Sequence, residues 1–539
     1  MSNFFHFFKQ IPRPLFWAAL SGILVGTSYI PFPGWALFFC YIPLWLSILH
    51  LQKNQASLIK IFFAGWITQF ILTLIGFNWI YYVSAEFGHL PWEMSLSALL
   101  LFASAMHIYI PLSLTFSCWI LRRRNISDTS IQIIIFALSQ ALLERVWPSI
   151  FEWNLGYALL WMRFPLFQWA DTVGFWGLST WILLIQAILC IGIMAWKKNE
   201  RTKALKVFTG LSAVVLVLTA LGVVKEKKWS FTNETINFAV AQGNIGDAEK
   251  VLSEKKEQFQ SYIYQVYVDL TDQHLKNNPQ TEIVLWPETA LPFALDVEFH
   301  QRPLQISLLK KVADWNITLL TGGYSQSTTR RDHLGNSLTR NSVFFIGPQM
   351  KLQAAPYNKT ALLVFGEYMP FGEEFPYLYQ LFPFVGVYER GPGPHPERLQ
   401  LAGEKSITVG PQICYESLDS SFARGLAEKG SDLIFNVTND SWFGWWAEPF
   451  QNNTMSLARA IEVRRPLVRS TNTGISSAIL ANGMLLESST LNKTWTHTYE
   501  IKYLKQAPQS FYTLWGHWDW VIWTLAFIIL LFKGKYVRN

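Results

Sequence analysis

The chain is poor in cysteine and in charged residues. It has four cysteines among 539 residues, and only 15% of its residues are Asp, Glu, Lys or Arg. Cys40, Cys118 and Cys190 lie inside strongly apolar stretches, which leaves Cys414 alone in the long polar part of the sequence. A lone thiol cannot form a disulfide within that part, so Cys414 is inert, bound to a metal, or a nucleophile.

Two further absences exclude classes of function. The net charge is +7, but no basic stripe with interleaved aromatic residues is present, so we expect no nucleic-acid partner. The ten histidines show no metal-ligand spacing, and His395 and His497 are isolated. The segment that begins at Gly243 lacks the Gly-Lys-Ser/Thr ending of a phosphate-binding loop. We therefore expect no metal and no cofactor.

Hydrophobic residues, in contrast, make up 51% of the chain. They form nearly continuous runs over residues 1 to about 225 and over 513–532, and about 20 apolar residues in succession span a bilayer. The pattern predicts a polytopic α-helical membrane protein. We expect about eight spans, near 14–32, 35–52, 59–83, 95–121, 133–149, 167–195, 207–224 and 513–532.

These spans divide the chain into a seven-helix membrane domain at 1–224, an insert at 225–512, and a final helix with its tail at 513–539. The insert alternates β-branched apolar runs with amphipathic stretches, which predicts an α/β layered domain. The expected strands are 236–242, 282–286, 317–322, 342–346, 406–413, 432–437 and 466–470. The expected helices are 248–276, 301–315, 417–429 and 450–464.

Lys and Arg are distributed unevenly among the loops. They precede the first span and follow the second, fourth, sixth and eighth, whereas loops 33–34 and 84–94 have none. Because short cytoplasmic loops are enriched in Lys and Arg, we expect both termini in the cytoplasm and the insert outside, on the periplasmic side of a bacterial inner membrane. That compartment is oxidising, so an inert, unpaired Cys414 fits it poorly.

The fifth expected span carries two adjacent charges, Glu144 and Arg145. Charges within a bilayer are costly and usually face the interior of a helix bundle. Two interpretations stay open, namely a polar contact between helices and the lining of a cavity for lipid head groups.

Three polar residues, Glu288, Lys359 and Cys414, stand at or just beyond the ends of expected strands. Strand ends are where sites collect in layered α/β domains. A helix that begins after Cys414 would lower the pKa of the thiol. A nearby carboxylate could take its proton, and a lysine could stabilise an oxyanion. Each residue alone is most often a solvated loop residue, so the three must be considered together.

The motifs around these residues resemble a known family. They are Trp286-Pro287-Glu288, Asn358-Lys359, Phe365-Gly366-Glu367 and Cys414-Tyr415-Glu416. Together they match the Glu-Lys-Cys signature of the nitrilase superfamily. Motif order, spacing and the apolar spans are most similar to its integral-membrane branch, the apolipoprotein N-acyltransferases, and the resemblance covers nearly the whole chain.

This resemblance implies a fold and a reaction. The insert would be a nitrilase-like α-β-β-α sandwich. Cys414 would attack a phospholipid ester and hold the acyl chain as a thioester, and the chain would then pass to the α-amine of a diacylglyceryl-cysteine at an apolipoprotein N-terminus. Glu288 would be the general base, and Lys359 would stabilise the oxyanion.

The resemblance also implies supporting roles. Glu367 would support the triad. Tyr415 and Glu416 flank the nucleophile, and the backbone N–H of Tyr415 could donate to the oxyanion. The chain departs from the family pattern at Val251, Arg340 and Arg464, and none of these departures removes a catalytic group.

Two loop-like stretches are crowded with aromatic residues. One follows Glu367 and includes Phe382 and Phe384; the other follows Asn439 and includes Trp442, Phe443, Trp445 and Trp446. Aromatic rings favour the membrane interface, and large apolar loops are seldom left in water. We interpret both stretches as lipid-facing arms that gate lipid entry, with packing inside the insert as the alternative.

Two other functions remain open. A membrane-anchored nitrilase-type amidase would use the same three residues on a soluble amide, and a non-enzymatic transporter or binding protein would carry a degenerate insert. The aromatic stretches and the spans favour an acyltransferase, and the intact Glu288, Lys359 and Cys414 argue against degeneration.

Overall fold

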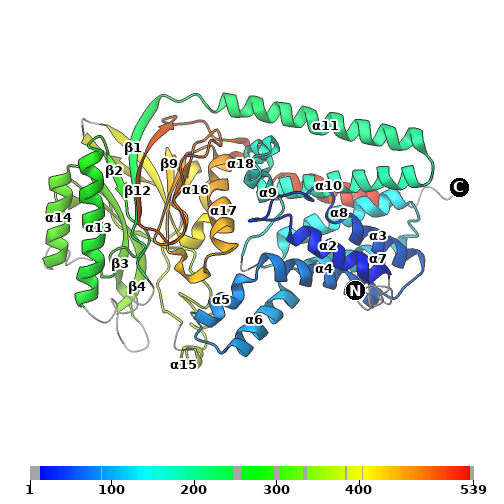
Figure 1. The fold of residues 1–539 in the computed structure, drawn as a ribbon, viewed down its shortest axis with the longest axis horizontal. Helices are drawn as coiled ribbons and strands as arrows, with labels where there is room; N and C mark the ends of the chain where they lie inside the picture. Colours follow the sequence, from blue (N-terminus) through cyan, green and yellow to red (C-terminus); the bar gives the residue numbers. More distant parts are fainter. Residues whose placement is uncertain are drawn as a thin grey trace, which may run out of the picture. The chain divides into compact units, whose positions relative to one another are not determined.

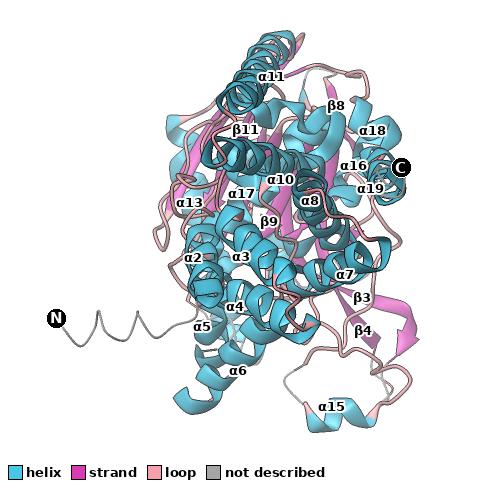
Figure 2. Cartoon of the chain, turned by 90° about the vertical axis from the view of Figure 1, so that its right-hand side faces the viewer, coloured by secondary structure: helices cyan, strands magenta, loops and turns pink. Residues whose placement is uncertain are grey.

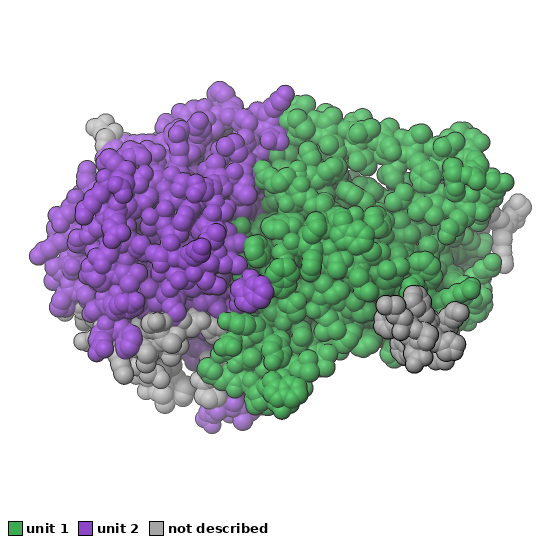
Figure 3. All heavy atoms as spheres, in the orientation of Figure 1, with its two compact units in different colours: residues 1–225, 446–454, 515–539 green, residues 226–445, 455–514 purple. Residues whose placement is uncertain are grey.

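The computed structural model describes residues 13–86, 88–149, 151–246, 257–295, 303–331, 335, 337–382, 385–402 and 405–533. Val251 and Phe384 lie outside these residues. The chain forms two compact units (Figure 3). Unit 1 comprises 1–225, 446–454 and 515–539, and unit 2 comprises 226–445 and 455–514.

Unit 1 is helical (Figures 1 and 2). Its helices are α2 (Arg13–Gly26), α3 (Ile42–Lys53), α4 (Leu58–Gly76), α5 (Trp79–Glu86), α6 (Trp92–Ala105), α7 (Tyr109–Arg124), α8 (Thr129–Val146), α9 (Gly156–Trp161), η1 (Pro165–Trp169), α10 (Ala170–Lys197), α11 (Arg201–Lys228) and α19 (Asp519–Lys533). The last residues of α11 belong to unit 2.

Five segments of the described chain are long and apolar enough to cross a membrane. They are Leu58–Gly76, Trp92–Arg124, Thr129–Val146, Pro165–Lys197 and Arg201–Lys228. They coincide with the third to seventh expected spans. The first and last expected spans contain shorter apolar helices, Arg13–Gly26 and Asp519–Phe532. Helix α2 ends at Gly26, and Pro31 and Pro33 prevent a helix from continuing to the end of the expected span, because proline lacks the N–H that a helix interior needs.

Small residues let the helices of unit 1 approach closely. A Cβ on Gly22 of α2 would lie 2.7 Å from the carbonyl oxygen of Thr68 on α4. The Thr68 hydroxyl in turn donates to the carbonyl of Ala18 at 2.8 Å. A Cβ on Gly65 would lie equally close to Pro111 on α7. Such contacts replace the hydrophobic effect as the source of helix association in a bilayer.

Glu144 and Arg145 both make contacts between helices. Glu144 accepts hydrogen bonds from the Tyr109 hydroxyl at 3.0 Å and the Ser179 hydroxyl at 2.9 Å. Arg145 donates through both terminal nitrogens to Asp519, at 3.0 and 2.5 Å, which ties α8 to α19. These contacts agree with the structural interpretation of the two charges.

In its described residues, unit 2 contains two β-sheets, of order β12-β1-β2-β3-β4-β5, with β6 also paired to β4, and β11-β10-β9-β8-β7. The strands are β1 (Glu234–Gln242), β2 (Ile283–Leu285), β3 (Thr318–Arg331), β4 (Ser337–Gly347), β5 (Lys351–Leu352), β6 (Tyr357–Asn358), β7 (Glu397–Gln400), β8 (Ser406–Ile413), β9 (Leu433–Thr438), β10 (Leu467–Thr471), β11 (Ser477–Ile479) and β12 (Trp495–Tyr503). Strands β1 to β3 are parallel, as are β8 to β10, so the carboxyl ends of each set share one edge.

Further helices lie wholly or partly in unit 2. They are α13 (Glu257–Asn277), α14 (Pro303–Trp315), α15 (Tyr377–Leu381), α16 (Ser420–Glu428), α17 (Glu448–Val463) and α18 (Phe511–Trp515), with the short 3₁₀ turns η3 (Cys414–Ser417) and η4 (Asp440–Phe443). The α17 helix begins in unit 1 and ends in unit 2. Helices α13 and α14 lie along one face of the first sheet (Figure 1).

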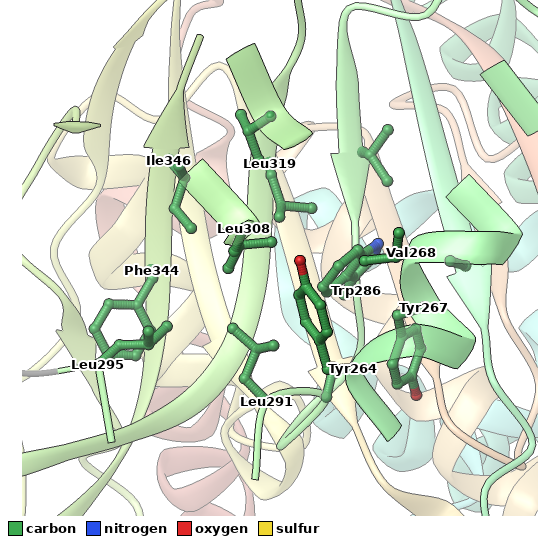
Figure 4. Close-up of a cluster of buried hydrophobic side chains, with 14 of the residues drawn as sticks. Tyr264, Tyr267, Val268, Trp286, Leu291, Leu295, Leu308, Leu319, Phe344 and Ile346 are labelled. Atoms are coloured by element: carbon green, nitrogen blue, oxygen red, sulfur yellow. The ribbon is translucent and has the colours of Figure 1, made fainter. Parts of the chain in front are cut away.

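Alternating side chains on the strands build the core of unit 2. Phe344 and Ile346 of β4 join the apolar cluster between the first sheet and α13 and α14, where Trp286 stacks on Tyr267 with ring centroids 5.3 Å apart (Figure 4). Phe345 points the other way, and its ring meets Phe435 of the second sheet at 6.4 Å. Successive side chains of a strand point to opposite faces of its sheet. The first sheet therefore contacts helices with one face and contacts the second sheet with its other face.

The structure confirms the expected strands and, within a few residues, the expected helices of the insert. Helix 248–276 is described only from residue 257 onward. The sequence pattern missed β5, β6, β7, β11 and β12. All five pair antiparallel with their neighbours, and only β11 is fully buried. The other four are short or partly exposed and lack a continuous apolar run.

Replacing Leu308 by Ala should destabilise unit 2 by about 2–5 kcal/mol, because the fully buried side chain would leave a cavity in the core. Ile306, on the same helix and 36% exposed, is the matched control, and its replacement by Ala should cost about 1 kcal/mol or less. The measurement is the urea concentration at which unit 2 becomes cleavable by a protease in the detergent-solubilised protein. Equal midpoints for the two variants would contradict this account of the core.

Candidate active site

Glu288 lies in the turn after β2 and is 6% exposed. Its Oε1 accepts from the side-chain amide of Asn341 at 2.7 Å and lies 3.4 Å from Nζ of Lys359. Its Oε2 accepts from the backbone N–H of Asn439, after β9, at 3.0 Å. A Cβ on Gly322 of β3 would lie 2.7 Å from the Glu288 Cα, so the neighbouring strand must carry a glycine there.

Lys359 follows β6 and is 1% exposed. Its backbone N–H donates to the carbonyl of Asn341, and its own carbonyl accepts from Gly391, both at 2.8 Å. The Nζ atom lies 2.8 Å from the nearer oxygen of Glu367. Burial lowers the pKa of the Lys359 ammonium, but the surrounding charges, Glu367 foremost, outweigh burial and hold that pKa well above its ordinary value. Lys359 is therefore a buried, charged ammonium.

Asn341 joins the two carboxylates that flank Lys359. Its Nδ2 donates to Glu288 and also to Glu367, at 3.0 Å. Glu367 also accepts from the backbone N–H of Leu363 at 2.8 Å. Asn341 was not among the site residues predicted from the sequence. The available signal was the single amide side chain of β4, which stands where the polar first half of the strand meets its apolar second half.

Cys414 follows β8 directly and is a half-buried free thiol with a φ angle of +50°. This left-handed conformation is uncommon for a residue with a Cβ, and such residues cluster at functional sites. The Cys414 carbonyl accepts from the Ser417 hydroxyl at 2.9 Å. Tyr415, the next residue, is also half-buried.

The expected lowering of the thiol pKa is wrong. Only the 3₁₀ turn η3 begins at Cys414, and α16 begins at Ser420, so no long helix points its N-terminus at the sulfur. Burial instead raises the pKa of the Cys414 thiol well above its ordinary value, the charge of Glu288 raises it further, and Lys359 opposes them. The resting thiol is therefore protonated at neutral pH and needs a base before it can act as a nucleophile.

Glu416 is fully buried and binds backbone segments together. It accepts from the N–H groups of Thr360 at 2.5 Å and Ala361 at 3.2 Å. It also accepts from the N–H of Ile413 and from the Tyr357 hydroxyl, both at 2.8 Å. Burial raises the pKa of Glu416 to about 7, although these hydrogen bonds lower it. Glu416 thus fixes the segment after Lys359 against the end of β8.

The aromatic stretches are largely exposed. The exposed fractions are 41% for Phe382, 44% for Trp442, 67% for Trp445 and 38% for Trp446, and Phe443 is half-buried. Trp446 belongs to unit 1, where its ring meets Phe32 at 5.7 Å. Helix α15, just before Phe382, lies at the tip of a loop that extends away from both sheets of unit 2 (Figure 2). Packing inside the insert therefore does not describe the exposed residues.

The structure thus places Glu288 and Glu367 against Nζ of Lys359, and the charges of all three groups affect the pKa of the Cys414 thiol. Glu416 lies behind them as a structural carboxylate. No group of three or more His, Cys, Asp or Glu side chains suited to hold a metal ion occurs in the part of the chain that the structure describes. The arrangement offers a thiol, a carboxylate base and a buried cation, which is the set needed for acyl transfer through a covalent intermediate.

Comparison with known proteins identifies the family. Residues 21–188 match the apolipoprotein N-acyltransferase N-terminal domain, and residues 238–508 match the carbon-nitrogen hydrolase domain. The apolipoprotein N-acyltransferase of Bdellovibrio bacteriovorus is 46% identical over 99% of this chain and 96% of that protein. The one of Geobacter metallireducens is 28% identical over 99% and 98%.

Among solved structures, a carbon-nitrogen hydrolase from Helicobacter pylori G27 is similar at 16% identity and a TM-score of 0.35, over 50% of this chain and 89% of that chain. The assignment rests instead on the two domain matches and on the relatives that align along nearly their whole length. By these matches the chain belongs to the apolipoprotein N-acyltransferase family.

Proposed function

We propose that Cys414 carries an acyl chain from a phospholipid to the α-amino group of the N-terminal diacylglyceryl-cysteine of apolipoproteins. One observation carries this proposal. The buried Lys359 ammonium contacts Glu288 and Glu367 at 3.4 and 2.8 Å, and the same three charges act on the Cys414 thiol. Membership of the family supports the two substrates.

The first step is attack on the donor ester. Because the resting thiol is protonated, Glu288 takes its proton as the sulfur bonds to the ester carbonyl carbon. The developing oxyanion receives an N–H of Lys359, since an ammonium has three donors and only two are used by Glu367 and Glu288. The C–O bond then breaks, and the lysophospholipid alkoxide leaves with the proton held by Glu288.

The second step reverses these roles. The acceptor amine attacks the thioester carbonyl, and Glu288 takes a proton from the nitrogen. The C–S bond breaks, the amide forms, and the Cys414 thiolate regains the proton. Throughout, Glu367 holds Lys359 in place, Glu416 holds the segment after it, and the backbone N–H of Tyr415 is a second oxyanion donor.

The membrane part of the proposal extends beyond the five apolar segments of sufficient length. We infer eight spans, with 1–224 and 513–539 in a bacterial inner membrane and 225–512 as a periplasmic α-β-β-α sandwich. The exposed aromatic stretches would enter the bilayer interface, where their apolar rings can contact lipid. A soluble amide, the substrate of the alternative amidase, would need none of this surface.

Replacing Cys414 by Ala should abolish acyl labelling of the protein, because no other described cysteine lies in unit 2. The measurement is radioactivity that remains on the purified chain after incubation with a phospholipid labelled in its acyl chains. Cys118→Ala is the matched control and should label like the wild type. Labelling that survives Cys414→Ala would contradict the proposed nucleophile. If the wild-type protein took up label only from labelled soluble amides and not from phospholipid, the result would favour the amidase.

Replacing Asn341 by Leu should lower kcat about 10- to 100-fold with little change in KM. The reason is that Glu288 and Glu367 would lose a shared donor while both stay buried. Steady-state kinetics of acyl transfer give both constants. Asn277→Leu, at an exposed position of α13, should leave them unchanged. A wild-type kcat in Asn341→Leu would show that the Asn341 amide is not needed to hold the Glu288 and Glu367 carboxylates in position.

Replacing Trp445 by Ser should raise KM several-fold for phospholipid in vesicles, because the exposed indole would no longer enter the interface. The turnover of a short-chain ester dissolved below its micellar concentration should not change. Tyr262→Ser, at a 54% exposed position of α13, is the control. If both substrates were affected equally, Trp445 would act on the chemistry and not on membrane contact.

A further inference from the structure

A fully buried ion pair lies behind Cys414, and the steps described above do not use it. Arg469 of β10 and Asp440, just after β9, have no exposed side-chain surface. The Arg469 Nη2 lies 2.7 Å from Oδ2 of Asp440. Removing two charges from water is costly, and a buried pair often adds little to stability compared with apolar residues. Stability alone therefore does not explain an ion pair at this position, close to a reactive thiol.

The carboxylate of the pair reaches the sulfur through one hydroxyl. Thr438, the last residue of β9, follows Val437, which pairs with Ile413, so Thr438 stands beside Cys414 at the ends of two neighbouring parallel strands. Its hydroxyl donates to Oδ1 of Asp440 at 3.1 Å, and its side chain lowers the pKa of the Cys414 thiol, against the effect of burial. A hydroxyl has a single proton. While that proton points to Asp440, Thr438 can offer the thiol only its oxygen lone pairs.

The guanidinium of the pair reaches the nucleophile's backbone through a chain of donors. Arg469 donates to the Ser456 hydroxyl at 3.0 Å, which is 2.6 Å from the Ser417 hydroxyl. Ser417 donates to the Cys414 carbonyl. Arg469 also donates to the Asn436 side-chain oxygen, and the Asn436 amide donates to the same carbonyl at 3.5 Å. This carbonyl belongs to the residue in the left-handed conformation.

The turn from Thr438 to Asp440 also binds Glu288, the proposed general base. Asn439, between Thr438 and Asp440, donates its backbone N–H to Glu288 at 3.0 Å. A displacement of Asp440 would therefore be transmitted to both sides of the proton transfer. There is no room for a side chain between residue 474 and the Asp440 carboxylate, because a Cβ on Gly474 would lie 2.1 Å from Oδ2 of Asp440.

We propose that Thr438 is a rotating hydrogen-bond donor for the Cys414 sulfur, and that Asp440 and Arg469 are positioning residues that set its resting direction. When Glu288 removes the thiol proton, the Thr438 hydroxyl turns from Asp440 to the thiolate. Asp440 loses one hydrogen bond but keeps Arg469 as its counter-charge. When the sulfur becomes a thioester, its charge is gone and the hydroxyl returns to Asp440. No proton leaves Thr438 in this cycle.

This inference rests on the proposed nucleophile and is tested without any lipid. The full-length protein in detergent is treated with iodoacetamide from pH 6 to 10, and alkylation of the Cys414 peptide is followed by mass spectrometry. Cys40, Cys118 and Cys190 are buried and serve as internal references. The other charges that act on the sulfur, Glu288, Lys359 and Glu367, are the same in every variant.

Thr438→Val should slow alkylation of Cys414 about 10-fold or more at every pH tested, because the thiolate loses a donor. Thr438→Ser, which keeps the hydroxyl, should restore the wild-type profile. In acyl transfer, Thr438→Val should lower kcat and leave KM for phospholipid unchanged. A Thr438→Val alkylation profile that superimposes on the wild type, or a Thr438→Ser profile that matches Thr438→Val, would overturn the inference.

Gly474→Ala tests the positioning role of Asp440 without removing a polar group. The added methyl should displace the Asp440 carboxylate, free the Thr438 hydroxyl for the thiolate and speed alkylation of Cys414, which is the opposite of the effect of Thr438→Val. An unchanged alkylation rate in a folded Gly474→Ala protein would show that the ion pair does not act on the sulfur. Failure of lipid transfer with a normal alkylation response would count against the proposed substrates and not against this inference.

Discussion

A single buried ammonium organises the candidate active site. Lys359 is 1% exposed, and an uncompensated charge at such a depth would cost several kcal/mol, so the fold must supply anions around it. Glu288, after β2, and Glu367, in the loop after β6, meet that requirement, and Asn341 on β4 joins them. Segments far apart in the sequence are thereby fixed around one point.

The parallel strands explain why these groups can meet beside a thiol. The carboxyl ends of β1 to β3 and of β8 to β10 carry Glu288, Cys414 and the turn at Thr438, and that turn donates a backbone N–H to Glu288 across the two sheets. The high pKa of the Cys414 thiol fits this setting. In the periplasmic compartment proposed for unit 2, a neutral thiol would be protected from oxidation and would become reactive only when substrate and base are aligned.

Much of this could be predicted from the sequence, for physical reasons. Strands buried on both faces give continuous apolar runs, which is why the central strands were found, and Glu288, Lys359 and Cys414 stand out as polar residues at their ends. Short or partly exposed strands such as β7 and β12 give no such run. Asn341 and the pair of Asp440 and Arg469 were missed because their importance depends on contacts between distant residues. The error on the thiol pKa arose from expecting a helix where only one 3₁₀ turn forms.

The central claim is that Cys414 transfers its acyl group to an amine and not to water. The most direct test is to acylate the protein with phospholipid, remove the donor, and add a diacylglyceryl-cysteine peptide while the mass of the Cys414 peptide is followed. The account predicts that free Cys414 reappears in step with one equivalent of N-acylated peptide. Release of free fatty acid at a rate that does not depend on the peptide would contradict it.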